Sequence, residues 1–342
     1  MNTALKKARI LLPAKGVAPE KWAVVACDQF TAQPEYWKEV ETVVGGAPST
    51  LNLTLPEVYL ADSDRRVPQI HAAMRDYLER GVLTEAVDGF VLVERTTPAG
   101  VRPGLVAALD LEQYDPSSGS NSLIRATEGT VASRVPPRAR IRSGAPLELP
   151  HAMMLIDDPQ RMVVETLYEN RDRLRPLYDF ELMLNGGHLR GWAVEGADAD
   201  RVFRIMDLLA RDANGLLYAV GDGNHSIAAA KQCWTQIRGE LTEAERESHP
   251  ARYALVELIN LHCPALVFEP VHRILFNVDS AMVLGELRRW LSERGVVDAP
   301  GDDLIVFDAD MRMNFRFEQY PLPLLQSFLD SYLARHPEAD ID

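Results

Sequence analysis

The chain is poor in cysteine and has no apolar run of membrane length. Its three cysteines, at positions 27, 233 and 263, are scattered along 342 residues. This spacing argues against a disulfide framework and a cysteine zinc site, and it indicates a reducing compartment. The apolar stretch ILL near the N-terminus is too short for a signal peptide or a membrane span. These absences predict a cytoplasmic protein with no membrane partner.

Basic charge is also scarce. The sequence has 36 lysines and arginines against 50 acidic residues, a net charge of −14. Binding to nucleic acid needs a basic surface, so this balance argues against nucleic acid as a partner and favours a small-molecule substrate. The Walker loop, GxGxxG, HExxH, GxSxG and the kinase HRD and DFG motifs are all missing from the sequence. Any active site must therefore be built from other residues.

What is present is an alternation of apolar strand-like runs and amphipathic helix-like runs, which predicts a mixed α/β fold. The expected portions are an N-terminal α/β portion at 1–122, a core at 123–280 and a C-terminal α/β segment at 281–342. Strands are predicted at 22–27, 89–95, 101–111, 151–156, 188–194, 216–220, 253–260 and 271–276. Helices are predicted at 34–43, 67–81, 198–210, 281–294 and 322–336, with a further helix starting at 226.

The loop Gly221-Asp222-Gly223-Asn224-His225 concentrates the most candidate functional residues, and it lies between an apolar run and a helix-forming run. A glycine loop in this position directs backbone N–H groups and the positive end of the helix dipole at one point, which favours phosphate. The alternative to a functional site is an ordinary strand-to-helix turn, since Asp, Gly and Asn are common turn residues. The histidine favours the functional interpretation.

Each side chain of this loop has an expected role. Asp222 is a candidate base or magnesium ligand. His225 would lie in the first helical turn, where the dipole lowers its pKa and favours the neutral imidazole. Ser226 would cap the helix.

A second candidate is the segment RATEGT at 125–130, which precedes a run rich in arginine. Arg125 and the arginines at 134, 138, 140 and 142 can hold phosphate or carboxylate through bidentate hydrogen bonds. Glu128 is a candidate base or metal ligand. A solvated, arginine-rich loop is the alternative interpretation.

Two further clusters suggest contacts with substrate. Asp28 and Gln29 follow a predicted strand, and strand ends are where ligands bind in α/β sheets. His272 and Arg273 form a pair that can bind an anionic substrate, or make a salt bridge with Glu269 at a strand edge.

Four segments together resemble the domain-of-unknown-function family 1015. They are ACDQFTAQPEYW at 26–37, IRATEGTVASRVPPRARIRSGAPLELPH at 124–151, AVGDGNHSIAAAK at 219–231 and FEPVHRILF at 268–276. The family typically continues beyond the last helix into an IDYIHG-type segment, so residues 281–342 are expected to be truncated relative to it.

The loop itself is similar to the DGxHR phosphate loop of the ParB/sulfiredoxin-like superfamily, which includes sulfiredoxins, ParB nucleotide-binding domains and free-serine kinases. Ser226 stands where that loop has arginine. We expect Arg273, or an arginine between 134 and 142, to replace the missing cation.

These resemblances imply a ParB/sulfiredoxin-like core and a phosphate- or nucleotide-binding enzyme. The implied reaction is phosphotransfer to a small polar metabolite such as serine, with ATP or ADP and Mg²⁺. The alternatives are a non-catalytic nucleotide-binding regulator, a phosphomonoester hydrolase and a ParB-like DNA-binding protein, the last disfavoured by charge.

The expected catalytic residues are Asp222, His225 and Glu128, with Asp222 also holding the metal. The expected phosphate-binding residues are Gly221, Gly223, Asn224, Ser226, Arg125 and Arg273. The expected substrate-binding residues are Asp28, Gln29 and His272.

Overall fold

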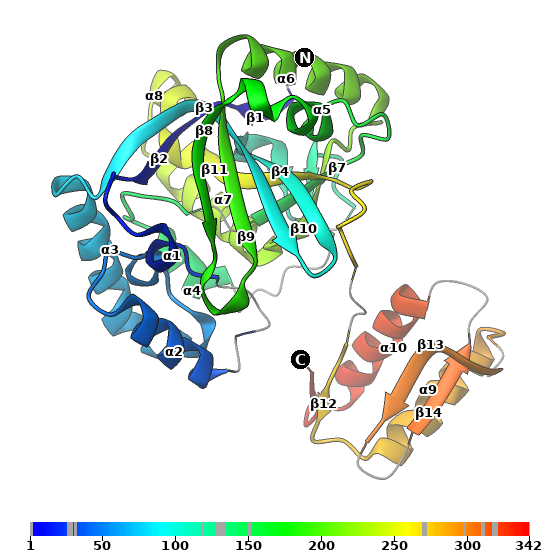
Figure 1. Ribbon diagram of the computed structural model, residues 1–342. Helices are drawn as coiled ribbons and strands as arrows, with labels where there is room; N and C mark the ends of the chain where they lie inside the picture. Colours follow the sequence, from blue (N-terminus) through cyan, green and yellow to red (C-terminus); the bar gives the residue numbers. More distant parts are fainter. Residues whose placement is uncertain are drawn as a thin grey trace. The chain divides into compact units, whose positions relative to one another are not determined.

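A computed structural model shows a mixed α/β fold in two compact units, Met1–Val267 and Phe268–Asp342 (Figure 1). The expected fold class is therefore confirmed. The structure describes residues 3–25, 30, 33–117, 119–127, 135–149, 152–268, 272–296, 299–308, 312–316 and 321–341. None of the helices in these ranges is both long and apolar enough to cross a membrane.

The first unit is organised around an 11-stranded sheet. Its order is β5-β6-β10-β7-β11-β4-β3-β9-β8, with β1 paired to β4 and β2 to β3. The strands are β1 Leu5–Lys6, β2 Ala8–Pro13, β3 Leu83–Thr97, β4 Gly100–Asp110, β5 Tyr114–Asp115, β6 Ile124–Arg125, β7 Ala152–Ile156, β8 Arg175–Glu181, β9 His188–Val194, β10 Tyr218–Asp222 and β11 Tyr253–Asn260. Because β4 pairs with β11, the expected portions 1–122 and 123–280 share this one sheet.

The helices of this unit are α1 Pro19–Trp22, α2 Pro34–Val44, α3 Ser63–Glu79, α4 Val135–Arg142, α5 Val164–Glu169, α6 Gly196–Asp212, α7 Asn224–Arg238 and α8 Glu243–Ser248. The 3₁₀ turns are η2 Thr50–Asn52, η3 Glu57–Asp62, η4 Leu111–Gln113, η6 Arg171–Arg173, η7 Met183–Asn185 and η8 Pro250–Arg252. Together with irregular segments, they connect the strands of the sheet (Figure 1).

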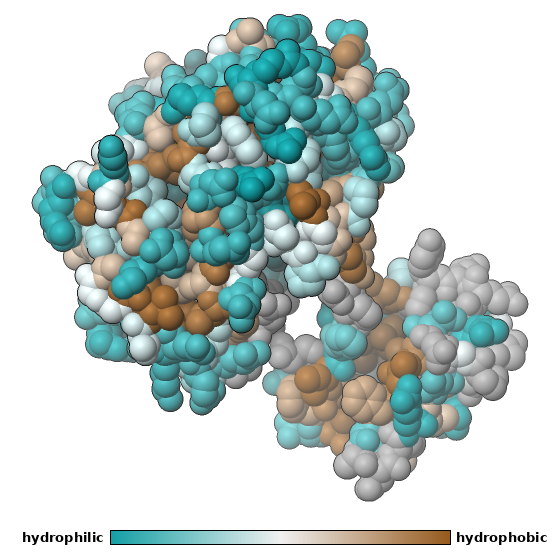
Figure 2. All heavy atoms as spheres, viewed as in Figure 1, coloured by the Kyte–Doolittle hydropathy of each residue, from teal (hydrophilic) through white to brown (hydrophobic). Residues whose placement is uncertain are grey.

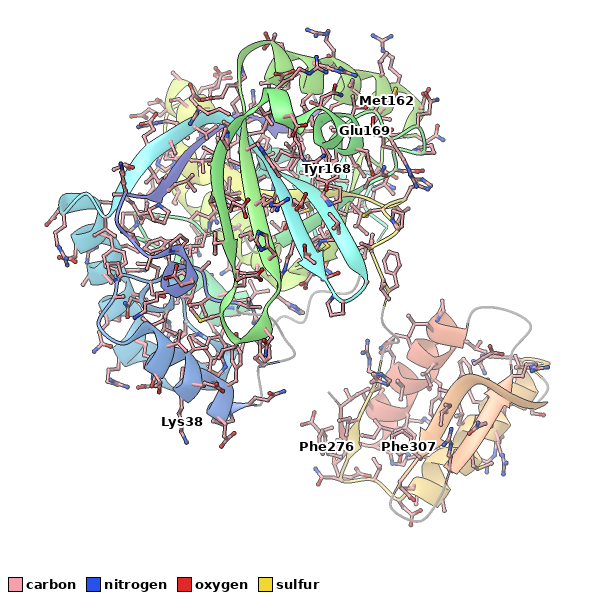
Figure 3. All side chains as sticks on the ribbon, in the orientation of Figure 1. Lys38, Met162, Tyr168, Glu169, Phe276 and Phe307 are labelled. Carbon is pink, nitrogen blue, oxygen red and sulfur yellow. The ribbon has the colours of Figure 1, made fainter. Side chains whose placement is uncertain are left out.

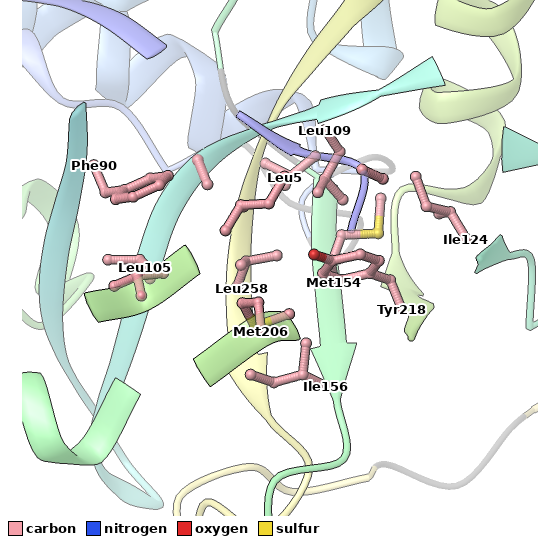
Figure 4. Close-up of a cluster of buried hydrophobic side chains, with 14 of the residues drawn as sticks. Leu5, Phe90, Leu105, Leu109, Ile124, Met154, Ile156, Met206, Tyr218 and Leu258 are labelled. Carbon is pink, nitrogen blue, oxygen red and sulfur yellow. The ribbon is translucent and has the colours of Figure 1, made fainter. Parts of the chain in front are cut away.

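The two faces of the sheet bury different side chains, because successive strand residues alternate between faces. One face, which we call the core face, packs Phe90, Leu105 and Met154 against α5, α6 and α7 (Figure 4). The opposite side, which we call the second face, carries Val93 and Val106 and a smaller cluster that includes Met153, Ala219 and Ile259. The candidate site involves this second face.

One predicted strand is wrong. In the strand predicted at 22–27, Trp22 ends α1 and 23–25 belong to no strand, while 26 and 27 lie outside the described residues. Pro19 begins the helix, which suits its fixed φ. The Trp22 carbonyl then accepts hydrogen bonds from the hydroxyls of Ser49 (3.3 Å) and Thr50 (2.8 Å), and Val24 N–H donates to Thr50 Oγ1 at 3.1 Å. Side chains thus provide hydrogen bonds here that a neighbouring strand would otherwise supply.

The second unit consists of α9 Ser280–Glu293 and α10 Pro321–Arg335 with two small sheets. Strand β12 Leu275–Phe276 pairs with β15 Asp340–Ile341, and β13 Ala299–Phe307 pairs with β14 Arg312–Arg316. Within the described residues, only 275–276 of the strand predicted at 271–276 are extended. The unit has its own core, built around Leu287, Phe328 and Tyr332.

Polar side chains cover much of the visible surface of the first unit, with apolar residues in separate spots (Figure 2). In the second unit, Phe276 and Phe307 are exposed by 47% and 73% (Figure 3).

Candidate functional site

The loop at 221–225 joins β10 to the 15-residue helix α7 through a single left-handed residue. Gly223 has φ 84° and ψ 29° and is the N-cap of α7. Its carbonyl accepts hydrogen bonds from the N–H groups of Ser226 and Ile227, both at 3.0 Å. Ser226 therefore lies inside the first helical turn, and the expectation that it caps the helix is wrong. Glycine takes the cap position because a left-handed φ carries a penalty for residues with a Cβ.

A polar latch fixes the loop to the end of β6. The Thr127 hydroxyl donates to the Val220 carbonyl at 2.6 Å. Asn224, only 4% exposed, accepts from Thr127 N–H and donates through Nδ2 to Thr127 Oγ1, both at 3.3 Å. Because β6 and β10 are parallel, their carboxyl ends meet at this point. The structure thus joins the start of the RATEGT segment to the glycine loop.

Asp222 is an exposed carboxylate at the end of β10. Its Oδ1 accepts a hydrogen bond from the N–H of Gly223 at 2.7 Å. The register shifts between Val220 and Asp222, and Asp222 stands opposite Met153. Directly opposed residues share a face, so this irregularity puts Asp222 on the second face; such bulges often redirect side chains beside active sites.

Gly221 fills a place where a side chain would not fit easily. A Cβ built on it would lie 2.9 Å from Cγ of Leu155 on the neighbouring strand. The backbone of the loop can therefore lie close to β7 only with glycine at this position.

Arg125 is not directed at the loop. Its Nε donates to the Ser122 carbonyl at 2.9 Å. Its Nη2 lies 3.5 Å from the point that a Cβ on Gly215 would occupy, before β10 begins. The guanidinium group therefore reaches toward the amino ends of β6 and β10, whereas the loop follows the carboxyl end of β10.

The arginines of α4 meet carboxylates of the protein itself. Their partners in ion pairs are Glu57 for Arg138, Asp64 for Arg140 and Glu148 for Arg142. These three arginines are thus paired with carboxylates outside the loop, which weakens their case as replacements for the superfamily arginine. Arg134 lies outside the described residues.

Helix α4 nevertheless bears on the site through packing. Val135 and Ala139 of α4 pack against Ala228, Ala229 and Cys233 of α7. The segment 124–151 therefore contacts the loop at Thr127 and supports the following helix at α4.

The remaining predicted residues fall in three parts of the chain. His225 and Ser226 are half-buried in the first turn of α7. His272 and Arg273 belong to the second unit, where Nη1 of Arg273 donates to the His272 carbonyl at 2.9 Å. Glu128, Asp28 and Gln29 lie outside the described residues.

The possible metal ligands are few. Across the described ranges, no group of three or more His, Cys, Asp or Glu side chains could hold a metal ion. Magnesium bound with a nucleotide commonly uses only one or two protein carboxylates, together with phosphates and water. Asp222 fits that limited role.

The comparisons with known proteins agree with the sequence motifs. Residues 11–320 match the family model described as "Protein of unknown function (DUF1015)", and the chain belongs to this family. No curated protein and no solved structure matches the chain.

Proposed function

We propose that the chain is a phosphate- or nucleotide-binding enzyme that transfers a phosphoryl group to a small polar metabolite such as serine. The observation that supports this most is the left-handed Gly223 at the start of α7, beside the exposed carboxylate of Asp222. The positive end of a long helix favours an anion, and the Asn224–Thr127 latch fixes the loop that presents it. The same loop supports a ParB/sulfiredoxin-like relationship for the core.

In this proposal Asp222 accepts the proton of the acceptor hydroxyl. The start of α7, with His225 in its first turn, balances charge that develops on the transferred group. ATP or ADP would supply the phosphoryl group and leave as ADP or AMP, and Asp222 would be the ligand from the chain for the magnesium bound with it. Because Asp222 already accepts from Gly223 N–H, its carboxylate is oriented before ligand binds.

The test is turnover by the full chain with ATP or ADP, Mg²⁺ and a panel of hydroxy-bearing metabolites including serine. Asp222→Asn keeps the side-chain shape but removes the base, so we expect turnover to fall by about 10²–10⁴-fold. The melting temperature should stay nearly unchanged, because Asp222 is exposed. Asp198→Asn is the matched control, an exposed aspartate in the first turn of α6.

The other outcomes separate the alternatives. Tight nucleotide binding without turnover would identify a regulator, and phosphate release to water a hydrolase. A large loss of stability in Asp222→Asn would mark this carboxylate as structural. Absence of both nucleotide binding and turnover would refute the proposal. ParB-like DNA binding is disfavoured by the net charge of −14.

A further inference from the structure

Two arginines face each other across the β3–β4 hairpin on the second face. Arg95 stands directly opposite Arg102 in the antiparallel register. Opposed residues lie about 5 Å apart at Cβ, and like charges in this position destabilise the pair. The Nε atoms of both side chains are buried and make no hydrogen bond with any described residue. An anion between or above the two guanidinium groups would offset their repulsion and could accept hydrogen bonds from the Nε atoms.

Glu257 meets only part of that need. Its Oε2 lies 3.9 Å from Arg102 Nη2, too far for a hydrogen bond, and its buried Oε1 has no hydrogen-bond partner among the described residues. Burial raises the pKa of the Glu257 carboxyl, and the charges of Arg102 and Arg95 only oppose that shift. The side chains of Arg102 and Glu257 still keep 14% and 25% of their surface accessible. Part of each side chain therefore stays in contact with solvent.

On the core face of β3, the buried charge of Glu94 has closer partners than the arginine pair has on the second face. Glu94 accepts a hydrogen bond from the Tyr168 hydroxyl at 2.6 Å and lies 3.5 Å from Arg190 Nη1. Within the described ranges, the side chain of its neighbour Arg95 makes one hydrogen bond, a long one of 3.4 Å to the Gly186 carbonyl. The fold can thus supply good partners to a charged side chain on this strand, and it does not do so for the arginine pair.

Two glycines lie near the arginines on the same face of the sheet. Val93 lies between Gly104 and Gly191 in one row across three strands. A Cβ on Gly104 would lie 2.2 Å from Glu257 Oε1, and a Cβ on Gly191 would lie 2.2 Å from Cζ of Tyr178. The two side chains therefore extend over the glycines from opposite sides of the row. Glycine within a strand commonly marks such a close approach.

Tyr178 adds a hydrogen-bond donor. Burial, and secondarily the charge of Glu257, raises the pKa of its hydroxyl well above the usual value. Like any tyrosine hydroxyl it is protonated at neutral pH, and it can donate to an anion.

The cluster lies on the same face as Asp222. Asp222 stands opposite Met153, which in turn stands opposite Glu257. Two strand spacings, about 10 Å, separate the backbones of Asp222 and Glu257. Arg102 lies on the next strand, four residues along β4 from Val106, the residue opposite Glu257, and Arg95 lies one strand further. A nucleotide at the loop and an acceptor at the arginine pair would therefore occupy one side of the sheet.

We propose that Arg95, Arg102 and Tyr178 bind the carboxylate of a small amino or hydroxy acid. Guanidinium groups bind a planar carboxylate through paired hydrogen bonds, and the Tyr178 ring lies over Gly191 beside the pair. This inference rests on the proposed function and narrows its acceptor to carboxylic acids. The carboxylate supplies the counter-charge that the arginine pair lacks.

The test compares binding of small acids with binding of their amides, using L-serine and L-serinamide as the first pair, by calorimetry without nucleotide. We expect the acid to bind and the amide, which lacks the negative charge, not to bind. Arg102→Gln should weaken acid binding at least about tenfold, the loss of one charge-assisted contact. Arg9→Gln is the matched control, because Arg9 is an exposed strand arginine paired with Glu85.

Tyr178→Phe keeps the ring over Gly191 and removes only the hydroxyl. It should weaken acid binding several-fold, and it tests the site even where Arg102→Gln does not fold. Equal binding of acids and amides, or unchanged acid binding in Tyr178→Phe and in a folded Arg102→Gln, would overturn the inference. Binding of inorganic phosphate but of no acid in the panel would also overturn it.

Asp222→Asn separates this inference from the proposed function. It should retain acid binding, since Asp222 lies outside the arginine pair, while losing turnover. Acid binding without any phosphotransfer in the wild-type chain would refute the proposed function alone. Phosphotransfer whose KM for the acid is unchanged in Arg102→Gln would refute the carboxylate site alone.

Discussion

The left-handed conformation of Gly223 gives the sharpest test of the loop, because a second glycine matches it elsewhere. Gly223 has φ 84°, and Gly144, just after α4, has φ 77° with no atom within 4 Å of an added Cβ. Alanine at a left-handed position costs about 1 kcal/mol. Both Gly223→Ala and Gly144→Ala should therefore lose about 1 kcal/mol of the free energy of unfolding. Against a typical total of about 5–15 kcal/mol, both variants remain folded.

The two variants should differ in ligand binding. Alanine at 223 shifts the N–H that holds Asp222 and the start of α7, whereas alanine at 144 leaves the loop unchanged. We expect Gly223→Ala to bind ATP or ADP with Mg²⁺ about tenfold more weakly, equivalent to about 1.4 kcal/mol, and Gly144→Ala to bind like the wild type. Urea unfolding measures the stability loss and titration calorimetry the affinity. Equal affinities in the two variants, at equal loss of stability, would refute the assignment of this loop as the phosphate site.

Three further predictions follow from individual contacts. His225→Ala should weaken nucleotide binding in the same titration, and unchanged affinity would exclude a direct role for the imidazole. Asp110→Asn should lower the free energy of unfolding by about 3 kcal/mol in urea, because the buried carboxylate accepts from Arg252 Nε at 2.9 Å and Nη2 at 2.6 Å; a loss below about 1 kcal/mol would contradict this. The raised pKa of Glu257 means that the folded chain retains a proton that the unfolded chain releases, so stability should fall as pH rises above the usual carboxyl pKa of 4.5. Glu257→Gln should remove that component of the slope, and identical pH profiles of unfolding free energy in the two proteins would contradict it.

Local patterns predicted much of the fold. Strand β11 covers 253–260 as predicted, and the β3–β4 hairpin turns at the expected residues between Thr97 and Gly100. These segments have strong apolar patterns and clear turn signals, so little tertiary information is needed. The strand predicted at 22–27 has an equally apolar start, but Pro19 and the hydroxyls of Ser49 and Thr50 decide its conformation. Contacts about 27 residues away in the sequence are not visible in a local pattern.

The candidate site shows the same division. The strand–loop–helix at 218–238 is continuous in sequence, so its geometry could be anticipated from composition. The role of Thr127 is not visible in the sequence, because its contact with Asn224 depends on the parallel pairing of β6 with β10. The glycines within strands at 104 and 191 were the signal for the arginine cluster. They mark close approach but do not show which side chain approaches.

Ser226 stands where the similar DGxHR loop has arginine, and the sheet shows where incompletely compensated positive charge lies in this chain. Arg138, Arg140 and Arg142 are paired with carboxylates, and Arg125 reaches toward the opposite strand ends. Positive charge with incomplete compensation lies instead on the second face, at the Arg95–Arg102 pair. Arg102 lies three strands from β10 and Arg95 lies four, so the pair is poorly placed to act on the same phosphate as the start of α7, but it can hold a second anionic group. On the proposed function, the loop and the arginine pair are therefore better suited to bind two anionic ligands on one face of the sheet than to hold a single phosphate between them.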